Sequence, residues 1–252
     1  VKNGHKIQVT YLLTMPHMFA AQSLVTLMIY DTLFNVKIIA VPDTRWIKPK
    51  TASMLKECQK FVANNYPNDL LLRSQCDEFG EWNDVLEDAD IVVYSTPYAI
   101  SNFRYNPQYA YGRNFLPVMV NYGYYRSIYD KDIVASQNYV YMWKIFAENE
   151  DIAELFKECA IRKDSNVDLT GYIKMDELAQ SSKKDTNRKR ILIAPHHSVE
   201  GGVNATLNLS NFQRYANFFL ELPKRYPEID FIFRPHPFLF TILKTFTVAG
   251  DI

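Results

Sequence analysis

The chain has 252 residues, and its 28 Lys and Arg balance its 28 Asp and Glu, so the formal net charge is zero. This balance argues against an electrostatic nucleic-acid binder, which needs a basic surplus. Cys58, Cys76 and Cys159 are odd in number and share no metal-type spacing. They are predicted to be free thiols in a reducing compartment, with no metal site.

Residues 7–30 carry no formal charge, which raises the question of a membrane span. Pro16, His17, Gln22 and other polar side chains interrupt this stretch, so it is too polar for a spanning helix. A strand followed by a buried helix is the better prediction.

Apolar runs and helical periods alternate along the first part of the chain. Strands are predicted at 6–13, 36–41, 70–72, 90–94, 117–121 and 167–170, and helices at 19–33, 52–64 and 150–160, with a helical turn around 82–86. Such alternation predicts a mostly parallel, doubly wound sheet. The polar stretch 181–190 has no apolar period, so we expect a linker there between a domain at 1–180 and a domain at 191–252.

The second domain begins with a strand, a helix and a strand. Residues 191–194 and 231–233 are continuous apolar runs, typical of parallel strands that are buried on both faces. Between them, Ser210 is the expected N-cap of an amphipathic helix that Pro223 should end or kink. The unit is therefore a βαβ unit, which is right-handed in nearly all proteins.

Both of these strands lead into basic side chains. His196 and His197 follow the first strand, and Arg234 and His236 follow the second. Ligands of open α/β sheets bind at the carboxyl ends of the strands. Imidazoles and a guanidinium at this edge indicate an anionic, phosphorylated ligand.

Three segments carry a resemblance to a known family. They are residues 194–198 (Ala-Pro-His-His-Ser) with 234–237 (Arg-Pro-His-Pro), residues 166–176 (Asn-Val-Asp-Leu-Thr-Gly-Tyr-Ile-Lys-Met-Asp) and, more weakly, residues 90–101. Together they resemble the CDP-glycerol glycerophosphotransferases, which build teichoic-acid-type polymers. The resemblance spans most of residues 6–239.

The resemblance implies a GT-B-like α/β fold of two Rossmann-like domains with mostly parallel sheets. It implies transfer of glycerol phosphate from CDP-glycerol, or a related nucleotide-activated donor, to a hydroxyl of a polysaccharide or lipid-linked glycan, with release of CMP. The first domain would face the acceptor and the second would bind the donor. No cofactor or metal is expected, and the protein would be cytoplasmic, with peripheral contact to the inner face of the cell membrane as an option.

The resemblance also suggests roles for the residues at the strand ends. His236 is expected to contact the donor pyrophosphate, and His236 and His197 are the expected catalytic side chains. Arg234, His196 and Ser198 are expected to bind substrate. Adjacent residues of an extended chain point to opposite faces, so only one of His196 and His197 should face the ligand, with His197 favoured. A structural histidine and an exposed strand-end arginine remain the alternatives.

One motif of the family is altered in this chain. Teichoic-acid-type members carry a Trp-His-Gly-like motif after the strand at 117–121, and its histidine is the expected base. Here residues 120–124 read Val-Asn-Tyr-Gly-Tyr, which keeps Gly123 and loses the histidine. Either another residue such as His17 takes the role, or the chemistry is weak or altered.

Tyrosines are concentrated between residues 94 and 146, which hold eleven of the seventeen in the chain. Aromatic rings stack on sugars, so Tyr122 and Tyr124 are expected to bind the acceptor. The alternative is a half-buried surface, or a face for a membrane or a partner.

Family members continue past the Arg-Pro-His-Pro motif with an Asp/Ser-rich segment that this chain lacks. We therefore expect a truncated member whose second domain is incomplete. Two further hypotheses stay open, namely a GT-B glycosyltransferase that uses a nucleotide sugar, and a non-catalytic remnant or binding module.

Overall fold

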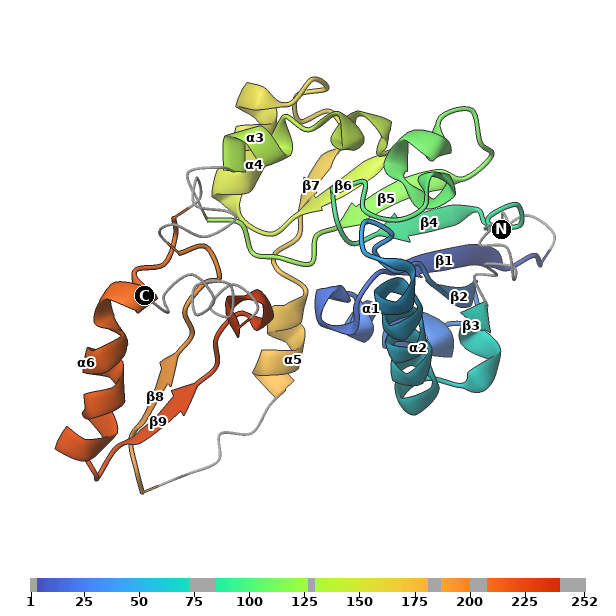
Figure 1. Cartoon of the computed structure of the whole chain (residues 1–252). Coiled ribbons are helices and arrows are strands. Elements are labelled where there is room, and N and C mark those ends of the chain that lie inside the picture. Colours follow the sequence, from blue (N-terminus) through green and yellow to red (C-terminus); the bar gives the residue numbers. More distant parts are fainter. Residues whose placement is uncertain (1–3, 73–84, 127–129, 181–186, 200–207, 241–252) are drawn as a thin grey trace. The chain divides into compact units, whose positions relative to one another are not determined.

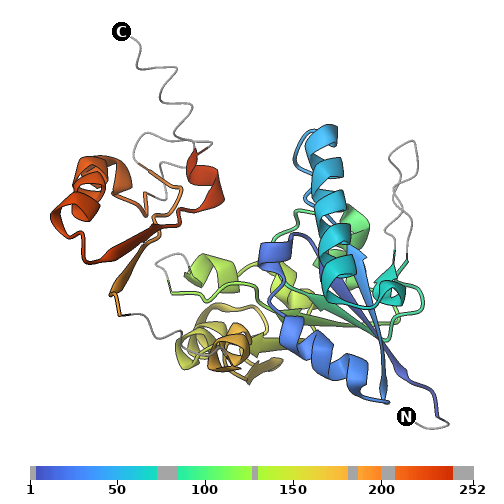
Figure 2. The same ribbon diagram turned by 90° about the horizontal axis from the view of Figure 1, so that it is seen from below.

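The computed structural model describes residues 4–72, 85–126, 130–180, 187–199 and 208–240 (Figure 1). The chain divides into two compact units, Val1–Ser181 and Ser182–Ile252. The first runs from blue to yellow and the second from orange to red in Figure 1 and Figure 2. Both units hold parallel strands and helices, so the predicted α/β class is confirmed.

The first unit is built on a seven-stranded sheet in the order β3-β2-β1-β4-β5-β6-β7. All neighbouring strands are parallel. The strands are β1 (Ile7–Leu13), β2 (Phe34–Ala40), β3 (Leu71–Leu72), β4 (Ile91–Tyr94), β5 (Leu116–Val120), β6 (Lys144–Ala147) and β7 (Val167–Leu169). The strand order reverses between β1 and β4, and such a switch point is where open α/β sheets form ligand crevices.

Helices cover both faces of this sheet. They are α1 (Gln22–Tyr30), α2 (Lys48–Asn65), α3 (Asp130–Val134), α4 (Glu150–Cys159) and α5 (Lys174–Gln180). Short 3-10 helices lie at Pro16–Met18, Asn68–Leu70, Phe103–Tyr105, Pro107–Ala110 and Gln137–Tyr141. Leu12 of β1 belongs to one core with Phe156 of α4, whereas Leu13 belongs to a second core with Val25 of α1 and Val62 of α2. Successive strand residues point to opposite faces, so the predicted doubly wound arrangement is confirmed.

Residues 7–30 form a strand and a helix, as predicted. However, α1 buries only Val25, while Leu27 and Tyr30 are 69% and 84% exposed, so the expectation of a buried helix is wrong. The helix begins at Gln22, later than the predicted start at residue 19, and a 3-10 turn at Pro16–Met18 precedes it. Among the described residues, no helix combines the length and apolarity needed to cross a membrane.

Among the strands and α-helices of the first unit, the sequence missed β6, α3 and α5. The strand β6 (Lys-Ile-Phe-Ala) has an apolar run of only three residues, which is too short to mark a strand in the sequence. The helical turn expected around 82–86 lies largely outside the described residues. Cys58 and Cys159 are free thiols, as predicted, and Cys76 lies outside the described residues.

The second unit contains β8 (Arg190–Ile193), α6 (Phe212–Arg225) and β9 (Asp230–Phe233). The two strands pair in parallel, with Ile191 opposite Phe231, which confirms the predicted strand–helix–strand order. The ring of Phe212 lies 5.3 Å from that of Phe233, so α6 packs on one face of the strand pair. On the other face Leu192 and Ile232 are 60% and 45% exposed, so the expectation of strands buried on both faces is wrong within the described part.

The boundaries of these elements differ from the predictions in three places. Asn211, not Ser210, is the N-cap of α6, although Ser210 Oγ accepts the N–H of Phe212 at 3.3 Å. Pro223 lies inside α6, which continues to Arg225, so this proline does not end the helix. Arg188, assigned to the linker, binds Asp230 with its Nε at 2.7 Å and is therefore part of the second unit.

Candidate functional site

Three histidines gather at the carboxyl ends of β8 and β9. The strand pairing continues past the last ladder residues, since the N–H of Arg234 binds the O of Ile193 at 2.8 Å and that of His236 binds the O of Pro195 at 3.0 Å. This alignment brings His236 beside the residues that follow Pro195. Ring centroids are 5.4 Å apart for His196 and His236, and 4.3 Å apart for His197 and His236.

The two adjacent histidines lie together, contrary to the prediction. Their ring centroids are only 4.1 Å apart. The chain bends at His197 instead of staying extended, so the alternation of an extended chain does not apply. Phe238 closes one side of the cluster, with its ring 5.7 Å from that of His197. We call His196, His197 and His236 the histidine cluster.

Hydrogen bonds fix the protons of two rings in this cluster. Nδ1 of His196 accepts the N–H of Ser198 at 3.1 Å, and Nδ1 of His236 accepts the N–H of Phe238 at 3.2 Å. A nitrogen that accepts a hydrogen bond carries no proton, so the neutral rings hold their proton on Nε2. Both rings therefore offer an Nε2–H donor.

Ser198 is a buried residue next to the histidine cluster, and it interacts with the ring of His196. It is only 1% exposed, and its Oγ lies 2.8 Å from Nδ1 of His196 and accepts the N–H of Leu209 at 3.0 Å. Ser198, expected to bind substrate, thus lies where it orients His196.

His196 and His197 carry little charge near neutral pH. Burial lowers the pKa of His196 and of His197, and the neighbouring ring of His196 lowers the pKa of His197 further. These two imidazoles therefore act as neutral hydrogen-bonding groups more than as cations. Arg234, exposed after the end of β9, supplies a permanent positive charge. Within the described ranges, no three His, Cys, Asp or Glu side chains are arranged to hold a metal ion.

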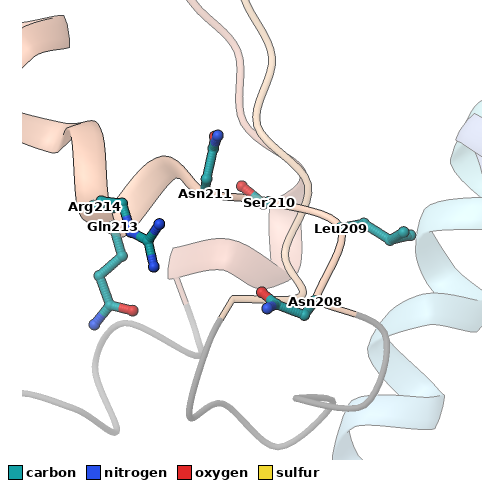
Figure 3. A pocket seen from close by; sticks show the side chains of 6 residues that line it. All are labelled: Asn208, Leu209, Ser210, Asn211, Gln213 and Arg214. Carbon is teal, nitrogen blue, oxygen red and sulfur yellow. The ribbon is translucent and has the colours of Figure 1, made fainter.

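A shallow cavity of about 440 Å³ lies at the start of α6. Figure 3 shows Gln213 and Arg214 extending from the first turn of the helix, with Asn211 pointing away from them. The cavity is lined by Asn208, Leu209, Ser210, Asn211, Gln213 and Arg214. The N–H of Ser210 binds the O of Ser198 at 3.1 Å, so the cavity wall is tied to the residue that supports His196.

A larger cavity of about 570 Å³ lies in the first unit, at the carboxyl ends of β5, β6 and β7. Asn121 follows β5, Glu148 follows β6 and the segment 170–172 follows β7. The lining residues are Leu24, Val120, Asn121, Phe146, Glu148, Thr170, Gly171, Tyr172, Ile173, Met175 and Asp176. We call this space the Glu148 cavity. It occupies the sheet edge where ligands bind in this class of fold.

Glu148 is the most unusual ionisable group of this cavity. The residue is 5% exposed, and Oε1 accepts the N–H of Tyr125 at 3.1 Å. Oε2 is buried and has no hydrogen-bond partner among the described residues. Burial raises the pKa of the Glu148 carboxyl and the charge of Asp130 adds to this, while Tyr125 and Asn121 offset part of it. A carboxyl that keeps its proton to higher pH is better suited to donate a proton than an ordinary surface carboxylate.

Sequence reasoning missed Glu148 because it missed β6. Once Lys144–Ala147 is known to be a strand, the rule that located the histidines also locates Glu148. The cap residue Asn149 directly after it was a second signal, since Asn before an amphipathic helix marks a helix start.

The predicted acceptor residues lie next to this cavity, through Tyr172. The hydroxyl of Tyr172 donates to the O of Tyr122 at 2.8 Å, and its ring lies 5.6 Å from that of Tyr124. Tyr124 is 52% exposed, whereas burial raises the pKa of Tyr122 to about 12.

The tyrosine-rich segment as a whole is not one surface. Tyr94, Tyr105, Tyr125 and Tyr139 are all buried in the core of the first unit. His17, the suggested substitute base, is exposed, and its carbonyl oxygen accepts Nζ of Lys174 at 3.1 Å. It is not one of the described residues that line the Glu148 cavity.

No family model and no curated relative matches this chain. Solved structures do match. The UDP-GlcNAc 2-epimerase from Neisseria meningitidis, bound to UDP-GlcNAc, matches with a TM-score of 0.54 at 16% identity, over 96% of this chain and 70% of that one. A putative UDP-N-acetylglucosamine 2-epimerase from Listeria monocytogenes matches with a TM-score of 0.58 at 14% identity, over 98% and 68%. The UDP-GlcNAc 2-epimerase from Methanocaldococcus jannaschii matches with a TM-score of 0.54 at 16% identity, over 98% of this chain and 70% of that one.

These matches confirm the GT-B-like fold that the sequence predicted. They overturn the predicted resemblance to CDP-glycerol glycerophosphotransferases and the glycerol-phosphate transfer drawn from it, because the matching structures are UDP-GlcNAc 2-epimerases and no family model matches. The family prediction failed because short motifs such as residues 234–237 reflect the backbone geometry at the end of a strand. Two prolines fix the backbone around one histidine, and that geometry belongs to the edge of the sheet and does not identify a donor.

Proposed function

We propose that this protein is an enzyme that epimerises a nucleotide sugar, with UDP-N-acetylglucosamine as the first candidate substrate. The fold similarity to three epimerase structures supports this choice of substrate class. The observation that carries the proposal is Glu148, a buried carboxyl with a raised pKa in a cavity at the carboxyl edge of the sheet.

Epimerisation needs such a group. To invert a carbon that bears hydrogen, the C–H bond must break and form again on the other face. A positioned acid or base with a pKa near the working pH contributes typically 10²–10⁴-fold to such proton transfers. In this proposal Glu148 removes the proton from one face of that carbon, and a proton that derives from water is added to the opposite face.

The histidine cluster has the chemistry to bind a diphosphate. A diphosphate offers several acceptor oxygens and negative charge. His196 and His236 each offer an Nε2–H, and Arg234 adds a charged fork of donors. Because the pKa of His196 is lowered, an anion that binds there favours protonation, so affinity should rise as pH falls through the range in which this ring titrates.

Calorimetry with UDP-GlcNAc, UDP and free N-acetylglucosamine tests the binding part. His196→Ala and His236→Ala should each lower the affinities for UDP and for UDP-GlcNAc by similar factors. Glu148→Gln should leave the affinity for UDP unchanged. His5→Ala is the matched control, since His5 is exposed near the chain start. If UDP-GlcNAc does not bind, or if both histidine variants bind it as tightly as the parent protein, the assignment is wrong.

A further inference from the structure

The segment that follows β7 brings an aromatic ring to the wall of the Glu148 cavity. The N–H groups of Thr170 and Gly171 both bind the O of Ala147, at 3.1 and 3.2 Å. Gly171 has a φ of +88°, and the space beside its Cα is open, so glycine is needed there for its backbone conformation and not for lack of room. The chain turns at this glycine, and Tyr172 directly after it lines the cavity.

Two contacts hold the side chain of Tyr172 in place. Its hydroxyl donates a hydrogen bond of 2.8 Å to the backbone O of Tyr122, which follows β5. The ring of Tyr124 meets the ring of Tyr172 edge to face, with centroids 5.6 Å apart and the planes at 67°. Tyr172 is half-buried, so its ring is fixed and still has surface to offer to a ligand.

The lining of the cavity combines apolar and polar side chains. Leu24, Phe146 and Ile173 supply apolar surface. Asn121 and Glu148 supply polar groups. Small-molecule sites have this composition, in which apolar and aromatic side chains form the walls and a few polar groups fix the orientation. A pyranose ring matches such a lining, because its faces carry C–H groups and its rim carries hydroxyls.

Tyr172 has both kinds of surface in one side chain. The face of its ring can stack on the C–H face of a sugar. Its hydroxyl proton is used in the bond to Tyr122, so the oxygen remains an acceptor for a sugar hydroxyl or an amide N–H. Burial raises the pKa of Tyr172 and the charge of Glu148 adds to this, so the hydroxyl stays protonated at ordinary pH.

We propose that Tyr172 binds the sugar ring of the substrate in the Glu148 cavity, and that Tyr124 is a positioning residue that acts through Tyr172. This inference rests on the proposed function for the identity of the sugar, an N-acetylhexosamine. The contacts that hold the Tyr172 ring do not depend on that identity.

Calorimetry with UDP and UDP-GlcNAc tests the role of the Tyr172 ring. Tyr172→Leu keeps an apolar side chain and removes the ring, so it should lower the affinity for UDP-GlcNAc about three- to tenfold and leave the affinity for UDP unchanged. Tyr172→Phe keeps the ring and should retain most of the affinity for UDP-GlcNAc. Tyr111→Leu is the matched control, because Tyr111 is 85% exposed and is not one of the described residues that line the cavity.

A second pair of variants tests Tyr124, whose 52% exposure makes it the safer position for folding. Tyr124→Leu removes the ring that holds Tyr172 and should lower the affinity for UDP-GlcNAc by a smaller factor than Tyr172→Leu. Tyr124→Phe keeps that ring contact and should restore the affinity. In turnover, Tyr124→Leu should raise KM with little change in kcat, as expected for lost substrate binding.

The outcomes separate this inference from the proposed function. If Tyr172→Leu and Tyr124→Leu bind UDP-GlcNAc as tightly as the parent protein, or lower the affinities for UDP and UDP-GlcNAc by the same factor, the inference is overturned even where the parent protein epimerises the sugar. If both variants lose affinity for UDP-GlcNAc alone and the parent protein leaves the sugar unepimerised, the proposed function fails and the assignment of Tyr172 stands.

Discussion

Oδ1 of Asn149 accepts the backbone N–H of Ile152 at 2.9 Å, and this bond caps helix α4. Asn149 is the residue directly after Glu148, so the cap also fixes the turn that leads from β6 into the helix. Ile152 is 1% exposed and anchors the first turn in the core. The position of the proposed acid–base group therefore depends on an ordinary helix cap.

Loss of this cap should destabilise the first unit. Asn149→Ala is expected to lower the free energy of unfolding by about 1 kcal/mol, because the N–H of Ile152 loses its partner. Asn149→Ser keeps a capping oxygen and should recover most of the loss. Urea unfolding measures both variants, and equal stability of the Asn149→Ala variant and the parent protein would show that the cap contributes nothing.

Glu148→Gln should change how stability depends on pH. The pKa of Glu148 is raised in the folded state, so above the unfolded value of 4.5 the folded protein binds more protons than the unfolded chain. The free energy of unfolding therefore falls as pH rises through this window, and Glu148→Gln abolishes that fall. Thermal unfolding between pH 4 and pH 8 should show that the stability of the variant, relative to that of the parent protein, increases as pH rises.

The control for this experiment is Glu158→Gln, at an exposed glutamate on helix α4. It should follow the parent protein across the range. A parent protein that gains stability relative to the Glu148→Gln variant as pH rises would contradict the assigned direction.

Asp43 lies at the same edge of the sheet and should have the opposite effect to Glu148 on how stability depends on pH. It is fully buried, and Oδ1 and Oδ2 accept Nε and Nη2 of Arg45 at 3.0 and 2.7 Å. Burial alone would raise the pKa of Asp43, but the hydrogen bonds from Arg45 outweigh it and lower the pKa below 3.8. Ionised Asp43 therefore stabilises the folded state above pH 3.8, and this stabilisation is lost as pH falls through the pKa that Asp43 has in the folded protein.

Asp43→Asn should lower the free energy of unfolding at pH 7 by about 1.5 kcal/mol. This is the low end for charged hydrogen bonds, because the Arg45 side chain is 65% exposed and water screens the pair. The loss should shrink when urea unfolding is repeated near pH 3. A loss of the same size at both values would contradict the ionic origin.

Nitrogen NMR of the histidine rings tests the proton positions in the second unit. Nδ1 of His196 and of His236 should show the chemical shift of an unprotonated acceptor nitrogen at neutral pH, with the proton on Nε2. Ser198→Ala removes the hydroxyl beside Nδ1 of His196 and should alter that ring while leaving His236 unchanged. A proton on Nδ1 of both rings would contradict the donor arrangement on which diphosphate binding rests.

Much of the fold followed from the sequence, because continuous apolar runs such as that at β4 mark buried parallel strands. The missed strand β6 has Lys144 at its start and only Ile145 and Ala147 buried, so its pattern was too short to identify. Local pattern also could not show that the chain bends at His197. Nor could it show that β8 pairs with β9, which are far apart in the sequence, and that His236 therefore lies beside His197.

The candidate site was predicted only in part, for a related reason. The histidines were found because they follow strands that the sequence marks clearly. The pKa of Glu148 depends on burial and on Asn121, Tyr125 and Asp130, which come from different segments of the first unit. The substrate class was misjudged because residues 234–237 describe the end of a strand and carry no contact that distinguishes one donor from another.

Proton NMR of UDP-GlcNAc incubated with the protein in D2O is the decisive test of the proposed epimerisation. Deuterium should enter the sugar at the inverted carbon, and a second UDP-N-acetylhexosamine should appear. Glu148→Gln should abolish both, while Glu158→Gln should not. Bound UDP-GlcNAc that gains no deuterium, or that loses its sugar to water or to an acceptor with the configuration unexchanged, would contradict it.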